Sequence, residues 1–215
     1  MLYICTELAK GLLVSISIFL LTLAFSLPFG LIVAFGRMSK NRLIQTIVKV
    51  YISIMRGTPL MLQLIAVFFA PYYIFKAKVG PSYRFTAVII AFVINYSAYF
   101  AEIYRGGIEA VPNGQYEAAN VLGYSKSQTF FRIVLPQVIK RILPAVTNEI
   151  ITLVKDTSLA SVIAVMEMFT TAKLIASADT TILPLIVAGI YYYVFNLIVA
   201  VSMEKIEKKF SYYKL

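Results

Sequence analysis

The sequence contains no histidine and a single cysteine, Cys5. Without histidine, the chain cannot build a Ser-His or Cys-His catalytic pair or a histidine-ligated zinc site. One cysteine cannot form a disulfide framework or a cysteine metal cluster. The sequence also lacks the Gly-x-x-x-x-Gly-Lys-Ser/Thr phosphate loop, so ATP-driven work requires a separate subunit. We therefore expect no metal site, no cofactor and no catalytic residues, which disfavours a membrane-embedded enzyme.

Charged residues are scarce and apolar residues are abundant. Of the 215 residues, 14% are charged and 60% are hydrophobic, and the mean hydropathy is +0.82. A soluble domain is about a quarter charged and about half apolar. The apolar residues lie in long blocks, which is typical of bilayer spans. The pattern predicts one all-α integral membrane domain over residues 1–215, with about five transmembrane helices near 8–35, 43–75, 85–104, 142–166 and 182–203.

Basic residues give the chain a formal net charge of +10, yet they lie mostly between and beside the apolar blocks. Nucleic-acid binding requires a basic face interleaved with aromatic residues on a soluble fold, so we expect no nucleic-acid partner. With five spans, twelve Lys and Arg residues share one side of the membrane and five lie on the other. The richer side should be cytoplasmic, which predicts an external N-terminus and a cytoplasmic C-terminus. The twelve residues are Arg37, Lys40, Arg42, Arg105, Lys126, Arg132, Lys140, Arg141, Lys205, Lys208, Lys209 and Lys214.

The polar stretch 105–141 interrupts the spans and is too long for a simple connector. Within it, residues 115–122 favour a short helix, and Gly123 stands where a helix end takes the left-handed conformation. A second helix follows, with Ser125 or Ser127 as its N-cap. We expect one or two short helices across the cytoplasmic mouth of the membrane domain, where they form a docking surface.

Seven residues of this stretch resemble the EAA loop of bacterial ABC-importer permease subunits. An isolated Glu-Ala-Ala triplet would indicate only an ordinary surface helix, but the later glycine and the Ile-x-Leu-Pro segment keep the family's spacing. Residues 56–60 with Gln63, and residues 155–159, are similar to segments of the polar amino acid permeases, the histidine/glutamine/arginine group. The matching loop residues are Glu117, Ala118, Ala119, Gly123, Ile133, Leu135 and Pro136.

This resemblance implies a type I ABC-importer permease fold in a bacterial cell membrane. It implies that the helix at 115–123 is a coupling helix, which docks in a groove of a separate ABC ATPase subunit. Other implied partners are a second permease copy (identical or a close homologue), an extracytoplasmic solute-binding protein, a polar or basic amino acid and membrane lipid. The implied coupling residues are Glu117, Ala118, Ala119 and Gly123.

ATP-driven alternating access is the mechanism that the resemblance implies. The residues by themselves leave other functions open. One alternative is a permease for another small polar solute. Another is an ATP-independent channel or secondary transporter, which would need neither the loop nor an ATPase partner.

Polar residues inside the apolar blocks are candidates for a substrate site, because such residues are costly in a bilayer. Asn95, Tyr99 and Glu102 lie near one helical face, which could present acceptors to an ammonium or guanidinium group. The structural alternative is that Asn95 and Glu102 only join helices together, or that Glu102 pairs with Arg105.

Two interruptions of the apolar blocks add further candidates. At 155–158, a broken helix would expose backbone groups near mid-membrane, and Asp156 would take the substrate's positive group unless it pairs with Lys155. At 56–59, a glycine and a proline favour a sharp change of direction, but the residues do not decide between substrate, ATPase and the second permease as its contact. The role of Glu149 is equally open. The candidates from these two segments are Arg56, Thr58, Asp156, Thr157 and Ser158.

Overall fold

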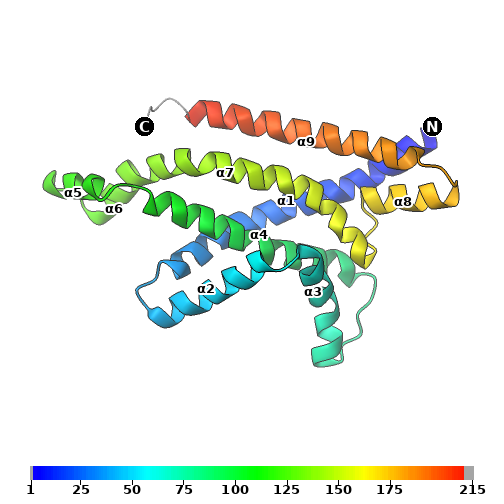
Figure 1. Ribbon diagram of the computed structural model, residues 1–215, viewed down its shortest axis with the longest axis horizontal. Helices are drawn as coiled ribbons and strands as arrows, with labels where there is room; N and C mark the ends of the chain where they lie inside the picture. The colour runs from blue at the N-terminus through cyan, green and yellow to red at the C-terminus, as the bar shows by residue number, and fades with distance from the viewer. Residues whose placement is uncertain (1, 211–215) are drawn as a thin grey trace.

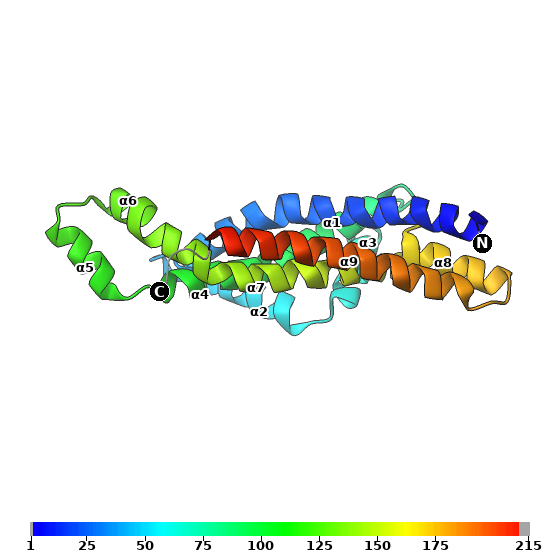
Figure 2. The same ribbon diagram turned by 90° about the horizontal axis from the view of Figure 1, so that it is seen from above.

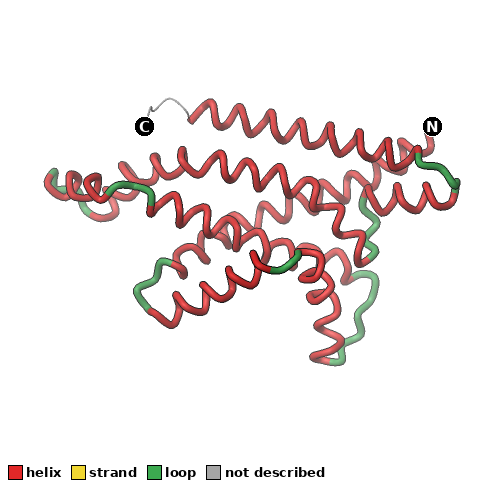
Figure 3. Tube along the Cα trace, in the orientation of Figure 1, coloured by secondary structure: helices red, strands yellow, loops and turns green. Residues whose placement is uncertain are grey.

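The structure, a computed structural model, describes residues 2–210, so Lys214 of the basic tail lies outside the described residues. Within them the chain is helical, with short loops and no strand, which confirms the all-α prediction (Figure 3). The elements are α1 (Leu2–Arg37), α2 (Arg42–Gly57), α3 (Leu60–Phe75), α4 (Tyr83–Glu109), α5 (Asn113–Val121), α6 (Lys126–Thr129), the π-helical turn η1 (Phe130–Val134), α7 (Leu135–Asp156), the 3₁₀ segment η2 (Thr157–Ile163), α8 (Met168–Ala178) and α9 (Leu183–Phe210).

Among the described residues, three helices are long and apolar enough to cross a membrane alone: α1, α4 and α9. Two further candidate spans are bent pairs. The pair α2 and α3 bends by 113°, and the segment Lys126–Ile163 bends by 56° against α8. Counting each bent pair as one span gives five.

The region 43–75 is therefore two helices that meet at a sharp break. Pro59 has no backbone N–H, and it restricts the preceding residue to extended backbone. Thr58 has φ −122° and ψ 147°, which ends α2, and α3 starts one residue after Pro59. In Figure 1, α3 projects away from the bundle that the long helices form.

The polar stretch is also shorter than the hydropathy predicts. Helix α4 continues five residues beyond 104, to Glu109, and α7 begins at Leu135. The short helices α5 and α6 protrude beyond the bundle at the end opposite the N-terminus, and α9 also ends on that side (Figures 1 and 2). We call this end of the molecule the loop end.

Local sequence explains the geometry of the loop end. Gly123 has φ +78°, the left-handed conformation expected after α5. The Ser125 hydroxyl accepts from the backbone of Gln128, whose side chain accepts from Ser125 N–H, so a capping box starts α6. Pro136 cannot donate a helical hydrogen bond, and just before it Leu135 N–H reaches back to the carbonyl of Phe130 in a π turn.

The core lies where α1 packs along α4 and α7. Phe92, Tyr96 and Phe100 of α4 are almost completely buried there. Small residues allow the two long helices to approach: a Cβ added at Gly30 would lie 2.9 Å from Cβ of Phe100 and 3.2 Å from the carbonyl of Ser97. Close packing over small residues is a main source of helix association in membranes.

We expect Gly30→Ala to destabilise the protein by about 1–3 kcal/mol, because the added methyl forces α1 away from α4. Gly189→Ala is the matched control, since nothing lies within 4 Å of a Cβ at that position in α9. Thermal unfolding of the purified protein in detergent measures both. Equal midpoints for the two variants would show that α1 and α4 do not need this contact.

Candidate functional site

The loop end presents α5 as an exposed helix. Glu117 and Ala118 are exposed, whereas Ala119 is 1% exposed and packs inward. Val121 and Leu122 are 87% and 73% exposed, which leaves an apolar tip beside the Glu117 carboxylate. Such a tip is typical of a docking surface.

A cavity of about 530 Å³ opens between α5 and α6. Its lining combines aromatic side chains with one carboxylate and one ammonium group. These features give the loop end a concave, partly apolar face with charges at its rim. The lining residues are Tyr116, Glu117, Asn120, Tyr124, Lys126, Thr129 and Phe130.

The break between α2 and α3 is fixed on α4 by two amide side chains. Asn95 Nδ2 donates to Gln63 Oε1 at 3.0 Å and to the carbonyl of Met55 at 3.1 Å. Gln63 Nε2 donates to the carbonyls of Met55 and Thr58 at 2.9 and 3.1 Å, and to Thr58 Oγ1 at 2.9 Å. The carbonyls that lose their helical partners at the break are thus paired. Asn95 joins α4 to this break, which agrees with the alternative that it holds helices together.

Arg56, the penultimate residue of α2, lies over the Tyr99 ring with its guanidinium carbon 5.3 Å from the ring centroid. Its side chain remains 46% exposed. A guanidinium on an aromatic face keeps its N–H donors available at its edge. Arg56 and Tyr99 are therefore brought together, with the charge still accessible.

Glu102 is the centre of an arginine cluster. Arg105 donates to both its carboxylate oxygens at 3.0 and 2.6 Å, and Arg37 and Arg56 each lie 3.9 Å from it. The Glu102 side chain is only 18% exposed. The carboxylate thereby links the ends of α1, α2 and α4, so the geometry favours its ion pair with Arg105 over a free acceptor for substrate.

The transition from α7 to η2 carries Asp156. Tyr96, buried in α4, donates its hydroxyl to Asp156 Oδ2 at 2.7 Å. No ion pair joins Lys155 to Asp156 within residues 2–210, and Lys155 is exposed. Asp156 is half-buried and keeps acceptor capacity beyond the Tyr96 bond.

The neighbours of Asp156 differ in their access to a ligand. Thr157 is completely buried and donates to the carbonyl of Val154 at 2.8 Å, so its side chain faces the protein interior. Ser158 is half-buried and donates to the carbonyl of Lys155 at 2.8 Å. Thr157 thus departs from the expected ligand-facing orientation.

Glu149 joins the same surface. It lies seven residues before Asp156, close to two helical turns, so both carboxylates share one face of α7. Glu149 interacts electrostatically with Arg56 and with Asp156. Glu149 therefore lies within electrostatic reach of both Asp156 and the Arg56 guanidinium, and Asp156 lies within reach of Lys155.

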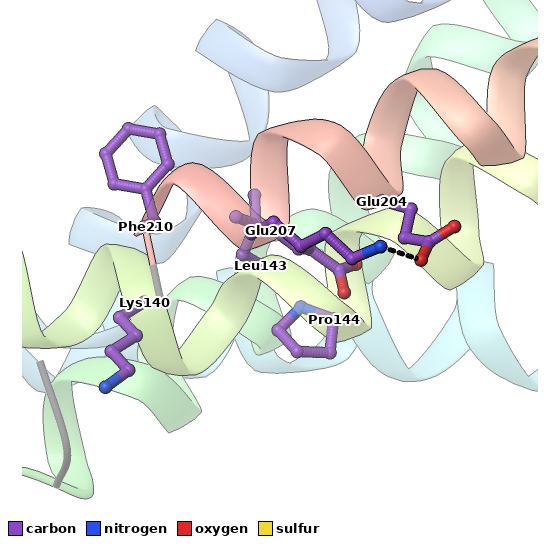
Figure 4. A pocket seen from close by; sticks show the side chains of 7 residues that line it. Lys140, Leu143, Pro144, Glu204, Glu207 and Phe210 are labelled. Carbon is purple, nitrogen blue, oxygen red and sulfur yellow. Dashed lines mark ion pairs between the residues drawn. The ribbon is translucent and has the colours of Figure 1, made fainter. Parts of the chain in front are cut away.

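A second cavity, of about 410 Å³, lies between α7 and α9 near the loop end (Figure 4). Three of its charged groups have partners: Glu204 pairs with Lys208 at 2.6 Å, and Glu207 accepts from Thr147. The hydrogen bond from Thr147 to Glu207 joins α7 to α9 at this cavity. Its lining is Lys140, Leu143, Pro144, Glu204, Glu207, Lys208 and Phe210. Among the described residues, no group of three or more His, Cys, Asp and Glu side chains could hold a metal.

Glu167 is a buried charged residue that the sequence analysis did not single out. It lies between η2 and α8, is 0% exposed, and its carboxylate accepts hydrogen bonds from three helices. The available signal was an acidic residue three positions before Thr170 at the start of an apolar helix, which is a capping pattern.

The chain matches known transport proteins over most of its length. Residues 26–212 match the family described as binding-protein-dependent transport system inner membrane component. The chain is 36% identical to the L-cystine transport system permease protein TcyB of Bacillus subtilis, covering 96% of this chain and 87% of that one. It is 34% identical to the arginine transport system permease protein ArtQ of the same organism, covering 93% and 90%. It is also 34% identical to a putative glutamine transport system permease protein GlnP of Rickettsia conorii, covering 94% and 92%.

Solved structures of ABC transporters also superpose on this chain. The crystal structure of an amino acid ABC transporter with histidines superposes with a TM-score of 0.88 at 32% identity, covering 97% of this chain and 96% of that one. The MetNI methionine ABC transporter in an inward-facing conformation has the same fold, with a TM-score of 0.72 at 14% identity and coverage of 97% and 96%. The chain belongs to the binding-protein-dependent transport system inner membrane component family, the multi-pass permease subunits of ABC importers, which operate with separate ATPase and solute-binding subunits.

Proposed function

We propose that this permease imports a zwitterionic amino acid and recognises it between α2 and α7. The observation that carries the proposal is the placement of an accessible cation, Arg56, in the electrostatic neighbourhood of Glu149, a carboxylate that shares one face of α7 with Asp156. An amino acid offers the complementary pair, one carboxylate and one ammonium group. The relatives named for cystine, arginine and glutamine transport support the same substrate class.

Each group takes a separate part of the substrate. Arg56 takes the substrate carboxylate, because a guanidinium matches that planar group with two parallel hydrogen bonds. Asp156 and Glu149 take the ammonium group, with Asp156 oriented by the Tyr96 hydroxyl. Thr58 and Ser158 line the same breaks and contribute hydroxyl groups. Asn95, Tyr99 and Thr157 position these groups, Glu102 joins helix ends through its arginine cluster, and none of the four binds substrate.

A second copy of the permease, or a close homologue, encloses the path. Helix α2 belongs to a bent membrane span, yet it exposes a polar stripe at spacings of three and four residues. Lipid does not solvate such a stripe, so it faces an aqueous path or a partner protein. The stripe consists of Arg42, Thr46, Lys49, Ser53 and Arg56.

The loop end lies in the cytoplasm, and α5 docks in the ATPase subunit. The excess of Lys and Arg on this side supports that orientation. The exposed Glu117, the apolar tip at 121–122 and the buried Ala119 support docking, since they offer a charge and an apolar contact on a helix anchored from behind. ATP binding then closes the ATPase pair and moves α5, which alternates the access of the substrate site. A permease for another small polar solute would need no facing cation and carboxylates.

Replacing the two protein carboxylates of the proposed substrate site tests their role in substrate binding. Asp156→Asn and Glu149→Gln should each raise the KM for uptake about tenfold or more, because a hydrogen bond to a charged group contributes about 1.5–3 kcal/mol. Proteoliposomes holding the complete importer, with radiolabelled glutamine, arginine or cystine, provide the assay. Asp179→Asn, at the exposed end of α8, is the matched control and should leave the KM unchanged. Wild-type KM values for both site variants would refute the assignment.

Replacing Glu102, at the centre of the arginine cluster, should change the stability of the protein and not the KM. Glu102→Gln should lower the free energy of unfolding by about 2 kcal/mol, because three partly buried guanidinium groups lose their shared carboxylate. The KM should stay near that of the wild type. Glu204→Gln, which removes an exposed pair with Lys208, should change stability little. A raised KM with unchanged stability would return Glu102 to the substrate site.

Reversing a charge on α5 tests coupling. Glu117→Arg should abolish copurification of the ATPase, or at least substrate-stimulated ATP hydrolysis, while the permease still inserts in the membrane. The reason is that the exposed carboxylate becomes a cation at the docking surface. Asp179→Arg makes the same charge change at the far end of the molecule and serves as control. Normal coupling in Glu117→Arg would exclude α5 as the docking element.

A further inference from the structure

Glu167 is a fully buried carboxylate that the proposed transport site does not use. It accepts from the backbone N–H groups of Phe169 and Thr170, each at 2.7 Å, and from Thr170 Oγ1 at 2.8 Å. These three bonds form the N-cap of α8. If Glu167 only capped α8, all of its donors would belong to the first turn of α8, as these three do.

Two more donors come from other helices. Tyr192 of α9 donates its hydroxyl to Glu167 Oε2 at 2.9 Å, and Ser15 of α1 lies 3.4 Å from the same oxygen. Gly11 makes the approach of α1 possible, since a Cβ there would lie 2.7 Å from Cα of Met168. The Ser15 hydroxyl also accepts from the backbone N–H of Met168 at 3.3 Å. Glu167 therefore fastens α1, α8 and α9 at one point.

The same cluster reaches the substrate site. Tyr192 packs against the buried cluster that contains Val154 and Ala160, on either side of Thr157, and its hydroxyl lies near the side chains of Thr157 and Ser15. Thr157 is completely buried and directly follows Asp156. Asp156 is thus held directly by Tyr96 of α4, and its successor in the chain, Thr157, lies near Tyr192 of α9.

We propose that Glu167, through Tyr192, is a positioning residue for substrate recognition: it fixes the turn from Thr157 to Glu167 against α1 and α9, and so aims Asp156 at the substrate. The inference rests on the proposed substrate site. A carboxylate is required, because five donors converge on one side chain and an amide would offer a single acceptor oxygen. Glu167 acts on the substrate only through Asp156 and does not touch it.

A double-mutant cycle between Tyr192→Phe and Asp156→Asn tests this. Tyr192→Phe removes the hydroxyl that donates to Glu167 and lies near Thr157. It leaves the backbone cap of α8 intact, whereas Glu167→Gln would weaken that cap. Uptake of radiolabelled glutamine, arginine or cystine by proteoliposomes with the complete importer is measured for the four proteins. We expect Tyr192→Phe to raise the KM about fivefold, as the loss of one hydrogen bond of about 1 kcal/mol does. In the Asp156→Asn background the same change should raise the KM less than about twofold, because coupled residues are not additive.

Two variants complete the design. Tyr193→Phe makes the same chemical change on a neighbouring side chain that is 69% exposed, and it should leave the KM unchanged. Ser15→Ala removes the weaker contact from α1 and should raise the KM less than Tyr192→Phe does. Its fold-change in KM should also become smaller in the Asp156→Asn background.

The outcomes separate the inference from the transport site. An unchanged KM for Tyr192→Phe, or an equal fold-change in both backgrounds, overturns the positioning role while Asp156→Asn still shows its own effect. A wild-type KM for Asp156→Asn refutes Asp156 as a substrate contact instead, and the positioning role with it.

Discussion

In a bilayer, an unpaired backbone carbonyl or charge has no water to bind, and this constraint explains where polar side chains lie in the permease. Each helix break releases backbone groups, and a buried polar side chain pairs with them. At the break after α2, Gln63 and Asn95 supply the donors. At the start of α8, Glu167 supplies the acceptor. The breaks persist because the neighbouring helices satisfy them.

The same constraint brings the breaks and the proposed substrate site together. Within a continuous helix the backbone N–H and C=O groups are already paired with one another. A helix break leaves some of these groups unpaired, and they give a charged side chain such as Arg56 or Asp156 polar neighbours. Tyr96 then orients Asp156, and Tyr99 supports Arg56. The polar residues that hold the fold and those that recognise the substrate are adjacent for one physical reason, the shared cost of polarity in the membrane.

Hydropathy and local motifs predicted the all-helical fold, the left-handed Gly123 and a cap at Ser125 or Ser127, of which the structure shows Ser125, since these features depend on nearby residues. The pairing of Glu102 with Arg105 was one of the two alternatives for Glu102, but its contacts with Arg37 and Arg56 could not be derived, because these residues come from other helices. Thr157 was a substrate candidate by its place in a polar segment, yet its orientation depends on packing around η2. Glu167 escaped notice because only the tertiary fold brings Ser15 and Tyr192 to it.

The connection between the loop end and the substrate site is short and continuous. Val111, Val134 and Val138 are buried in one cluster, which packs the segments flanking α5 and α6 against α4 and α7. Arg141 of α7 also donates to the carbonyl of Ala110, at the end of α4. The loop end is thus packed against α4 and α7, the two helices that the hydrogen bond between Tyr96 and Asp156 also joins. On the proposed assignment of α5 to ATPase docking and of Asp156 to substrate binding, a displacement of α5 would reach the substrate site through these two helices.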